Sequence, residues 1–297
     1  MIEIACRLPF DLALCQRVAR GFASGHISTQ AEPEESERAT LRLGVWLGDR
    51  PTRVDVRDDG AGTGRVTAIS EPAAPRETLE RLVRRVVNAD MDLMPFYERV
   101  SAHPVLGPLT RELPGLKPLR PASLFDMLVM AVTEQQISLA AAHHMQTRLV
   151  ERFGTSIDGL PVFPRAAALA DASIEALTAC GLSVRKAEYI QGVARAVVDG
   201  SLDLEELESA PADEVRDRIS SLRGFGRWSA DYILVRGLAH VDVVPYDDLA
   251  IRRVVGRMLS DGHSLTTGEA EEVLVPFSPF RGLTIFYLLV GSRLASS

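Results

Sequence analysis

Long apolar runs are missing from this sequence of 297 residues. No stretch approaches the roughly 20 apolar residues that a membrane-spanning helix needs, so we expect no membrane segment. The first residues also lack the basic start and long apolar core of a signal peptide. The expected location is therefore the cytoplasm, associated with the nucleoid if the protein is bacterial.

Metal-binding side chains are also scarce. The three cysteines, Cys6, Cys15 and Cys180, are too far apart for a Cys-x-x-Cys pair, and an odd number does not make a disulfide framework. Of the six histidines, His143 and His144 are adjacent in a predicted helix, so their side chains point in different directions. We predict inert thiols, no structural zinc site and no iron–sulfur cluster.

The overall charge offers little to a nucleic acid. Because phosphate binding depends on Lys and Arg, the net charge of −7 argues weakly against such a partner. Hydrophobic residues make up 46% and charged residues 25%, an ordinary globular composition. Residues 223–257 depart from this balance, with six arginines against four aspartates. That segment is either a solvated face or a contact surface for an anion.

The periodicity divides the chain into two parts. Alternating residues predict strands at 2–8, 40–47, 53–56 and 65–69. Residues 11–22 have helical spacing, and 70–75 form a Pro-containing linker. We therefore expect a β-rich domain at 1–75, an antiparallel sheet with one helix. No strand pattern follows, so 76–297 is predicted to be a larger all-helical domain, and the fold class is α+β.

Most of the second part has helical spacing. A long helix is predicted from about residue 124 to residue 153, with Ser123 as its N-cap and Gly154 at its end. Turns containing Gly and Pro are expected at 103–121. Further helices are expected at about 77–88, from about 90, and at 165–170, 173–179, 184–199, 203–208, 211–221, 227–238, 247–259, 267–273 and 280–294.

Residues 222–230 read Leu-Arg-Gly-Phe-Gly-Arg-Trp-Ser-Ala. Gly224 and Gly226 permit positive φ and close approach to an anion, and the helix that follows presents free N–H groups and its positive dipole end. Arg227 adds a full charge. With the preceding helix, 212–238 forms a helix–hairpin–helix. A lone Gly-x-Gly usually marks an ordinary tight turn. The interpretation as a phosphate site therefore depends on the whole sequence of residues 222–230.

Two aspartates, Asp247 and Asp248, follow Pro245 and Tyr246 about twenty residues later. Proline and aspartate both suit a helix N-terminus, so one interpretation makes both carboxylates caps. In the other, one caps the helix and the other faces a cleft. A cleft carboxylate stabilises a cationic transition state and orients water.

Together, residues 222–230 and the Val-Pro-Tyr-Asp-Asp-Leu-Ala-Ile-Arg-Arg run at 244–253 resemble the helix–hairpin–helix (HhH-GPD) DNA glycosylase superfamily. Within it they resemble the 3-methyladenine DNA glycosylase II (AlkA-like) branch. The resemblance is close over residues 85–295. Over the first 75 residues it lies in the arrangement of the elements more than in the sequence. It implies that hairpin amides hold a DNA phosphate, often with a Na⁺ or K⁺ ion on hairpin carbonyls. It also implies that Asp248 is catalytic, with Asp247 as its neighbour and a candidate cap.

Further roles follow from the same resemblance. Members that also cut the strand have a lysine nucleophile where this chain has Trp228, and no lysine follows Lys186. We therefore expect a monofunctional enzyme with water as nucleophile. The run Thr-Glu-Gln-Gln-Ile-Ser at 133–138 matches a stretch that reaches DNA at the lesion, although it also fits a solvated helix face. Gln136 is the preferred wedge, and Glu134 stands where the family usually has glycine.

The resemblance also supplies candidate contacts. The implied DNA-binding residues are Gly224, Phe225, Gly226, Arg227, Ser229, Ala230, Gln135, Gln136 and Arg252. A flipped purine stacks on aromatic rings, and cation–π attraction of about 0.5–2 kcal/mol favours a cationic alkylated base. The candidate pocket residues are Trp228, Tyr232, Tyr246, Phe125 and Leu289, with Phe286 and Tyr287 as further candidates. Leu289 stands where that branch has tryptophan, and core packing is the alternative for each aromatic.

The favoured function is a monomeric base-excision-repair glycosylase acting on double-stranded DNA. It is expected to flip out an alkylated purine, such as 3-methyladenine or 7-methylguanine, hydrolyse the N-glycosidic bond and leave an abasic site. Two alternatives stay open. One is a glycosylase for hypoxanthine, uracil or 8-oxoguanine, and the other is a non-catalytic DNA-binding protein with the same hairpin.

Overall fold

The computed structural model describes residues 1–21, 39–60 and 62–294. Its N-terminal part contains strands β1 (Ile2–Ala5), β2 (Thr40–Leu47), β3 (Arg50–Asp58) and β4 (Arg65–Glu71), with helix α1 (Leu12–Gly21) after β1. β1, β4, β3 and β2 are antiparallel neighbours, and buried and accessible residues alternate along β1 and β2. The predicted sheet with one helix is confirmed. Phe22, at the predicted end of that helix, lies outside the described residues.

Two further strands join this sheet from far along the chain. Its order is β1-β4-β3-β2-β6-β5, where β5 is Thr155–Ile157 and β6 is Leu160–Val162. The prediction of no strands after residue 75 is therefore wrong. Three-residue strands are too short to show alternation, and β6 pairs with a distant partner, since Gly44 of β2 lies opposite Val162. A Cβ at Gly44 would lie 2.6 Å from the carbonyl oxygen of Pro161, so glycine permits this approach.

The rest of the described chain is helical. Its helices are α2 (Arg76–Val86), α3 (Met94–Val100), α4 (Leu106–Glu112), α5 (Leu124–Glu134), α6 (Leu139–Phe153), α7 (Ala166–Ala170), α8 (Ile174–Thr178), α9 (Val184–Val198), α10 (Leu204–Ser209), α11 (Ala212–Ser221), α12 (Arg227–Arg236), α13 (Leu249–Leu259), α14 (Thr267–Leu274), the 3₁₀ turn η1 (Val275–Phe277) and α15 (Arg281–Leu294). Their positions confirm most predictions. α4 corrects the expectation of turns alone at 103–121.

The predicted long helix at 124–153 is two helices. α5 ends at Glu134, and α6 begins after Ser138, whose hydroxyl accepts a hydrogen bond from the amide of Ala141 at 3.3 Å. Between them Gln136 has φ of +56°, a left-handed conformation that interrupts the α-helical hydrogen bonds. The Gln-Gln-Ile-Ser part of the 133–138 run is thus the connection between two helices rather than part of a helix face.

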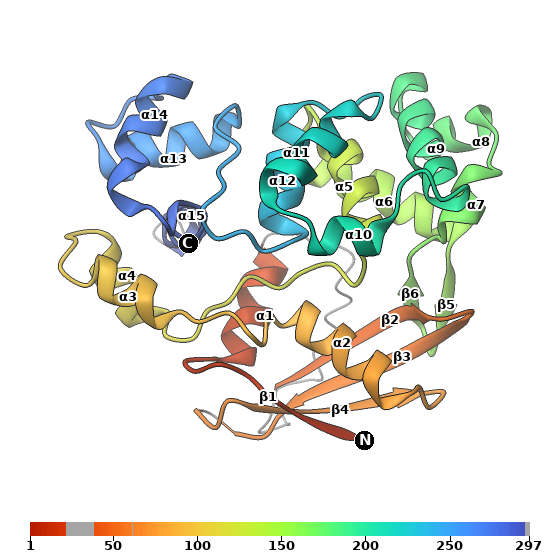
Figure 1. Ribbon diagram of the computed structural model, residues 1–297, viewed down its shortest axis with the longest axis horizontal. Coiled ribbons are helices and arrows are strands. Elements are labelled where there is room, and N and C mark those ends of the chain that lie inside the picture. The colour runs from red at the N-terminus through yellow and green to blue at the C-terminus, as the bar shows by residue number, and fades with distance from the viewer. Residues whose placement is uncertain (22–38, 61, 295–297) are drawn as a thin grey trace.

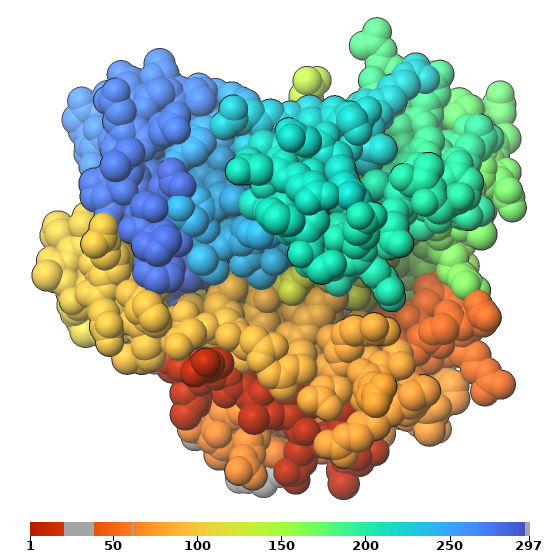
Figure 2. Space-filling model, viewed as in Figure 1, coloured from red at the N-terminus to blue at the C-terminus, as the bar shows by residue number. Residues whose placement is uncertain are grey.

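The buried side chains form two separate cores. One joins the N-terminal sheet and α1 to α2–α4 and α13–α15, and the other contains side chains from α5–α12. Figure 1 shows α13–α15 beside α5–α12, above the layer of the sheet and α2, and Figure 2 shows the two groups in contact across the molecular surface. The chain thus leaves the first core after residue 119, builds the second, and returns near residue 244.

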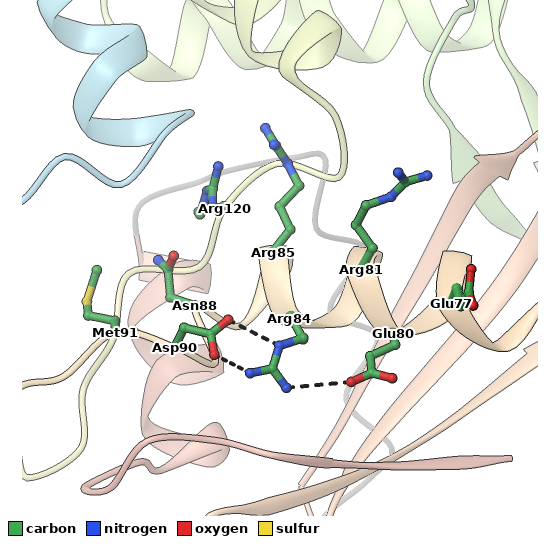
Figure 3. Close-up of a pocket in the computed structure, with 9 residues that line it drawn as sticks. All are labelled: Glu77, Glu80, Arg81, Arg84, Arg85, Asn88, Asp90, Met91 and Arg120. Carbon is green, nitrogen blue, oxygen red and sulfur yellow. Dashed lines mark hydrogen bonds and ion pairs between the residues drawn. The ribbon is translucent and has the colours of Figure 1, made fainter. Parts of the chain in front are cut away.

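Two arginines anchor the far end of α12 to the N-terminal half. The guanidinium groups of Arg85 and Arg120 both donate to the carbonyl oxygen of Gly237, the C-cap of α12, at 2.5–3.1 Å. Both side chains line a cavity of about 500 Å³ beside α2, where Arg84 pairs with Asp90 (Figure 3). Positive groups at a helix C-terminus offset its negative dipole end, so α12 is held from the end opposite its hairpin.

The described residues contain no single helix that could span a membrane. One bent pair, Thr267–Phe277 with Arg281–Leu294, passes by length and composition only, with an angle of 105° between its helices. Most of the second helix of the pair is buried in the first core.

Candidate active site

The hairpin at 222–226 joins α11 to α12 and leaves the start of α12 open. Gly224 has φ of +92°, and a Cβ there would lie 2.2 Å from the ring of Tyr189, so only glycine fits. Phe225 is 3% exposed and packs in the second core beneath the turn. Gly226 is the exposed N-cap of α12, and a Cβ there would meet nothing within 4 Å. An exposed helix N-terminus is suited to an anion.

Among the residues after Gly226, Arg227 faces solvent, whereas Ser229, Ala230 and Asp231 are buried. Arg227 is exposed, and its Nε lies 3.6 Å from Oδ2 of Asp231. Ser229 and Ala230 are 2% and 0% exposed, so their small side chains act as spacers inside the unit. Asp231 is buried and also accepts from Nε of Arg216 at 2.7 Å. Part of the local positive charge is therefore neutralised within the unit.

Gln135 connects the α5–α6 junction to the hairpin. Its side-chain Nε2 donates to the carbonyl oxygen of Gly224 at 2.9 Å and to Oγ of Ser229 at 3.0 Å. The Nζ of Lys186, on α9, donates to the carbonyl oxygens of Thr133 and Gln135, each at 2.9 Å. Gln135 thus supports the turn from inside. Lys186 has a positioning role that the sequence reasoning missed, because only the fold brings α9 to the end of α5.

Gln136, the predicted wedge, is exposed next to this network. Its left-handed backbone lies between the anchored Gln135 and the exposed Ile137. A side chain on a short, anchored connection can enter a duplex without disturbing a helix.

Asp248 is both the cap of α13 and the partner of an aromatic residue. Its Oδ1 accepts from the amides of Ala250 and Ile251 at 2.8 and 3.3 Å, and its Oδ2 accepts from Nε1 of Trp228 at 3.1 Å. The expectation that Asp247 is the cap is wrong, since Asp247 is exposed and its Oδ1 contacts the Thr267 hydroxyl at 3.5 Å. Because a carboxylate has two oxygens, one residue serves both functions.

Trp228 and Tyr232 form an aromatic wall beside this carboxylate. Their rings are stacked, with centroids 4.9 Å apart and planes 12° apart. The Tyr232 hydroxyl donates to Oε2 of Glu134, and the guanidinium carbon of Arg236 lies 5.8 Å from the Tyr232 ring centroid. Burial raises the pKa of Tyr232, as do the carboxylates of Glu134 and Asp248, while Arg236 lowers it. The hydroxyl therefore stays protonated as a donor to Glu134.

The other candidate pocket residues lie in or against the cores. Phe125 is 6% exposed in the second core, and Tyr287 is buried in the first, where its hydroxyl contacts that of Tyr97 at 2.8 Å. The half-buried Tyr246, Phe286 and Leu289 pack against the first core. The structure thus brings Trp228, Tyr232 and Asp248 together.

Arg252, a predicted DNA contact, is half-buried on α13. Its Nη1 donates to the carbonyl oxygen of Leu265 at 3.4 Å. The exposed arginine of the adjacent pair is Arg253.

The arrangement places a carboxylate beside a stacked aromatic pair, close along the chain to an open helix N-terminus. Such a carboxylate can stabilise positive charge that develops on a group stacked against the wall. Within the described ranges, no group of three His, Cys, Asp or Glu side chains is placed to hold a metal ion.

Comparison with known proteins adds four findings. Residues 129–279 match the family model of the HhH-GPD superfamily base excision DNA repair protein. A DNA-3-methyladenine glycosylase of Bacillus subtilis is 31% identical over 217 residues, 72% of each chain. The structure of a 3-methyladenine DNA-glycosylase from Archaeoglobus fulgidus is similar with a TM-score of 0.83 and 25% identity, over 99% of both chains. A 3-methyladenine DNA glycosylase of Schizosaccharomyces pombe, solved with abasic DNA, gives a TM-score of 0.61 and 26% identity over 69% of this chain and 99% of that one.

Proposed function

The chain belongs to the HhH-GPD superfamily of base excision DNA repair proteins, and we propose that it is a DNA N-glycosylase that excises alkylated purines. The names of the Bacillus and Archaeoglobus relatives support 3-methyladenine as a substrate. The observation that carries the proposal is the hydrogen bond from Trp228 to Asp248, which joins the aromatic wall to the carboxylate at 3.1 Å.

In this mechanism the hairpin holds the DNA backbone and the aromatic wall holds the base. Exposed N–H groups at the start of α12 and the charge of Arg227 bind a phosphate near the lesion. The flipped base stacks beside Trp228. The bond between the sugar C1′ and the base nitrogen breaks, and its electron pair leaves with the base, neutralising the cationic alkylated ring. Asp248 stabilises the positive sugar and orients water, whose oxygen bonds to C1′ as its proton passes to Asp248 or solvent.

We also propose that the enzyme is monofunctional. The sequence contains two lysines, Lys117 and Lys186. Lys117 is 1% exposed, Lys186 donates to two main-chain carbonyls, and Trp228 stands at the position expected for a lyase nucleophile. Borohydride added during turnover should trap no covalent protein–DNA adduct, and strand breaks should form only after alkali. A trapped adduct would contradict this.

A monovalent cation at the hairpin is a further proposal. The carbonyls of Leu222 and Gly224 each accept one hydrogen bond, from Phe225 N and Gln135 Nε2, which leaves each a second lone pair. A K⁺ or Na⁺ ion held there would add positive charge beside the phosphate. Duplex affinity should fall when KCl is replaced by tetramethylammonium chloride at equal ionic strength. Equal affinity in the two salts would exclude the cation.

A panel of duplexes, each with one lesion, tests the proposed activity. The protein, proposed to act as a monomer on nucleoid DNA, should release 3-methyladenine or 7-methylguanine faster than hypoxanthine, uracil or 8-oxoguanine. Faster release of hypoxanthine, uracil or 8-oxoguanine would identify that base as the substrate instead. Duplex binding without release of any base would identify a non-catalytic DNA-binding protein.

A further inference from the structure

Glu134, the last residue of α5, lies at the edge of the aromatic wall, beside the Tyr232 hydroxyl. Its Oε2 accepts from the Tyr232 hydroxyl on α12, and its Oε1 lies 3.3 Å from Nε2 of Gln146 on α6. Gln146 is 2% exposed and also donates to the Thr133 hydroxyl at 2.7 Å. A carboxylate is therefore fixed where three helices meet, although glycine is the residue that the family resemblance leads one to expect there.

Glu134 and Asp248 both act electrostatically on the wall. Burial raises the pKa of Tyr232 most, Arg236 lowers it, and the carboxylates of Glu134 and then Asp248 raise it. The Glu134 carboxylate contacts the hydroxyl at the edge of the wall, and Asp248 contacts the indole N–H of Trp228. A base stacked on Trp228 therefore lies in a field to which the two carboxylates contribute negative potential and Arg236 contributes positive potential.

The positive groups around Glu134 do not pair with it directly. Arg236 lies against the Tyr232 ring, and Lys186 is bonded to the carbonyl oxygens of Thr133 and Gln135. Burial and His144 lower the pKa of His143, on α6, and Glu134 raises it by less, so the neutral form of His143 is favoured. Tyr232 and then Glu134 raise the pKa of Arg236 through space, but none of the ion pairs found among the described residues includes Glu134.

We propose that Glu134 is a specificity-determining residue of the base pocket, whose negative charge favours positively charged alkylated bases over neutral damaged bases. This inference rests on the proposed function. An alkylation at N3 or N7 gives the purine a formal positive charge in DNA, whereas hypoxanthine is neutral. A carboxylate at the edge of a stacking surface attracts the first and not the second, because Coulomb energy depends on charge and distance. Glycine at this position would supply no such charge.

The test compares single-turnover excision of 7-methylguanine and hypoxanthine from otherwise identical duplexes. Glu134→Gln keeps an oxygen that can accept from Tyr232 but removes the charge, so the 7-methylguanine to hypoxanthine rate ratio should fall about threefold to tenfold. Glu134→Asp keeps the charge, and the ratio should stay within about twofold of wild type. Glu151→Gln makes the same charge change at an exposed site on α6 and should leave the ratio unchanged.

A second measurement does not depend on catalysis. Trp46 and Trp228 are the two tryptophans of the sequence, so Trp46→Phe leaves Trp228 as the sole indole reporter. In that background, quenching by the fixed cation 3,9-dimethyladeninium should be stronger than quenching by neutral 9-methyladenine. Glu134→Gln should reduce this preference. If Glu134→Gln does not fold, Glu134→Gly replaces it, because glycine is tolerated at a helix C-terminus.

The possible results separate the inference from the function beneath it. If the wild type excises 7-methylguanine and Glu134→Gln has the same base preference, the role of Glu134 is overturned. The proposed function is then unaffected. Failure of the wild type to excise either base would contradict the proposed function, and the inference would fall with it. An equal loss of both rates in Glu134→Gln would show a structural role only and would also overturn the inference.

Discussion

The indole N–H of Trp228 donates to Oδ2 of Asp248 at 3.1 Å, and this contact joins two separately packed parts of the chain. α12, which carries Trp228, packs in the second core, whereas α13, which Asp248 caps, packs in the first. The carboxylate is therefore positioned by the docking of the two cores as well as by its own helix.

Removal of this hydrogen bond should slow base excision. Trp228→Phe keeps an aromatic ring against Tyr232 but has no N–H for Asp248. A hydrogen bond to a charged group contributes about 1.5–3 kcal/mol, so the single-turnover rate on 7-methylguanine DNA should fall about 10- to 100-fold.

Trp46→Phe is the matched control for that variant. The Trp46 indole donates to the carbonyl oxygen of Phe163 at 2.8 Å, where β2 meets the residue after β6. Its loss should leave the excision rate within about twofold of wild type. A Trp228→Phe enzyme as fast as the Trp46→Phe enzyme would show that the indole N–H does not position Asp248.

Substitution of the two hairpin glycines should have different effects, on stability at Gly224 and on DNA binding at Gly226. Gly224→Ala places a methyl group 2.2 Å from the Tyr189 ring at a φ of +92°, so it should lower the free energy of unfolding by about 2–4 kcal/mol. Gly226→Ala meets open space at a φ of −101°, so the fold should be kept while the methyl group hinders the approach of a phosphate. Urea unfolding and duplex titration separate the two effects. Equal stability of the two variants would contradict the packing of Gly224 on Tyr189.

A buried lysine should make stability depend on pH. Nζ of Lys117 donates to the carbonyl oxygens of Arg7, Asn88 and Ala89, and burial lowers its pKa to about 8 from 10.5. Between these values the unfolded chain binds more protons than the folded one, so unfolding free energy should rise with pH. From pH 8 to pH 10.5, the free energy of unfolding of the wild type should therefore rise by about 1–3 kcal/mol relative to that of Lys117→Met. If this relative free energy of unfolding stays constant or falls over that pH range, the pKa of Lys117 is not lowered by burial.

The local sequence was enough to predict the hairpin and the helices around it. Gly224, Gly226 and the capping serines act through backbone geometry within a few residues, so their effect is visible in the sequence. The sheet of the first 75 residues is likewise predicted by alternation along strands of ordinary length.

Features that depend on distant partners could not be predicted. Glu and Gln are good helix formers, so nothing local ends α5 at Glu134, whereas Lys186 binds the last carbonyls of that turn only after folding. β6 is defined by its pairing with β2. Two adjacent aspartates have the same capping propensity, so only the family resemblance singled out Asp248 in the sequence; in the structure its contact with Trp228 distinguishes it.

Single-turnover excision of 7-methylguanine by Asp248→Asn, with Asp247→Asn as its matched control, tests the central claim most directly. Asparagine is as good an N-cap as aspartate, so Asp248→Asn should fold and bind duplex DNA normally. Loss of the charge should lower the excision rate about 100-fold or more, whereas Asp247→Asn should stay within about threefold of wild type. A folded, DNA-binding Asp248→Asn enzyme that excises the base at the wild-type rate would contradict the assignment of Asp248 and the mechanism built on it.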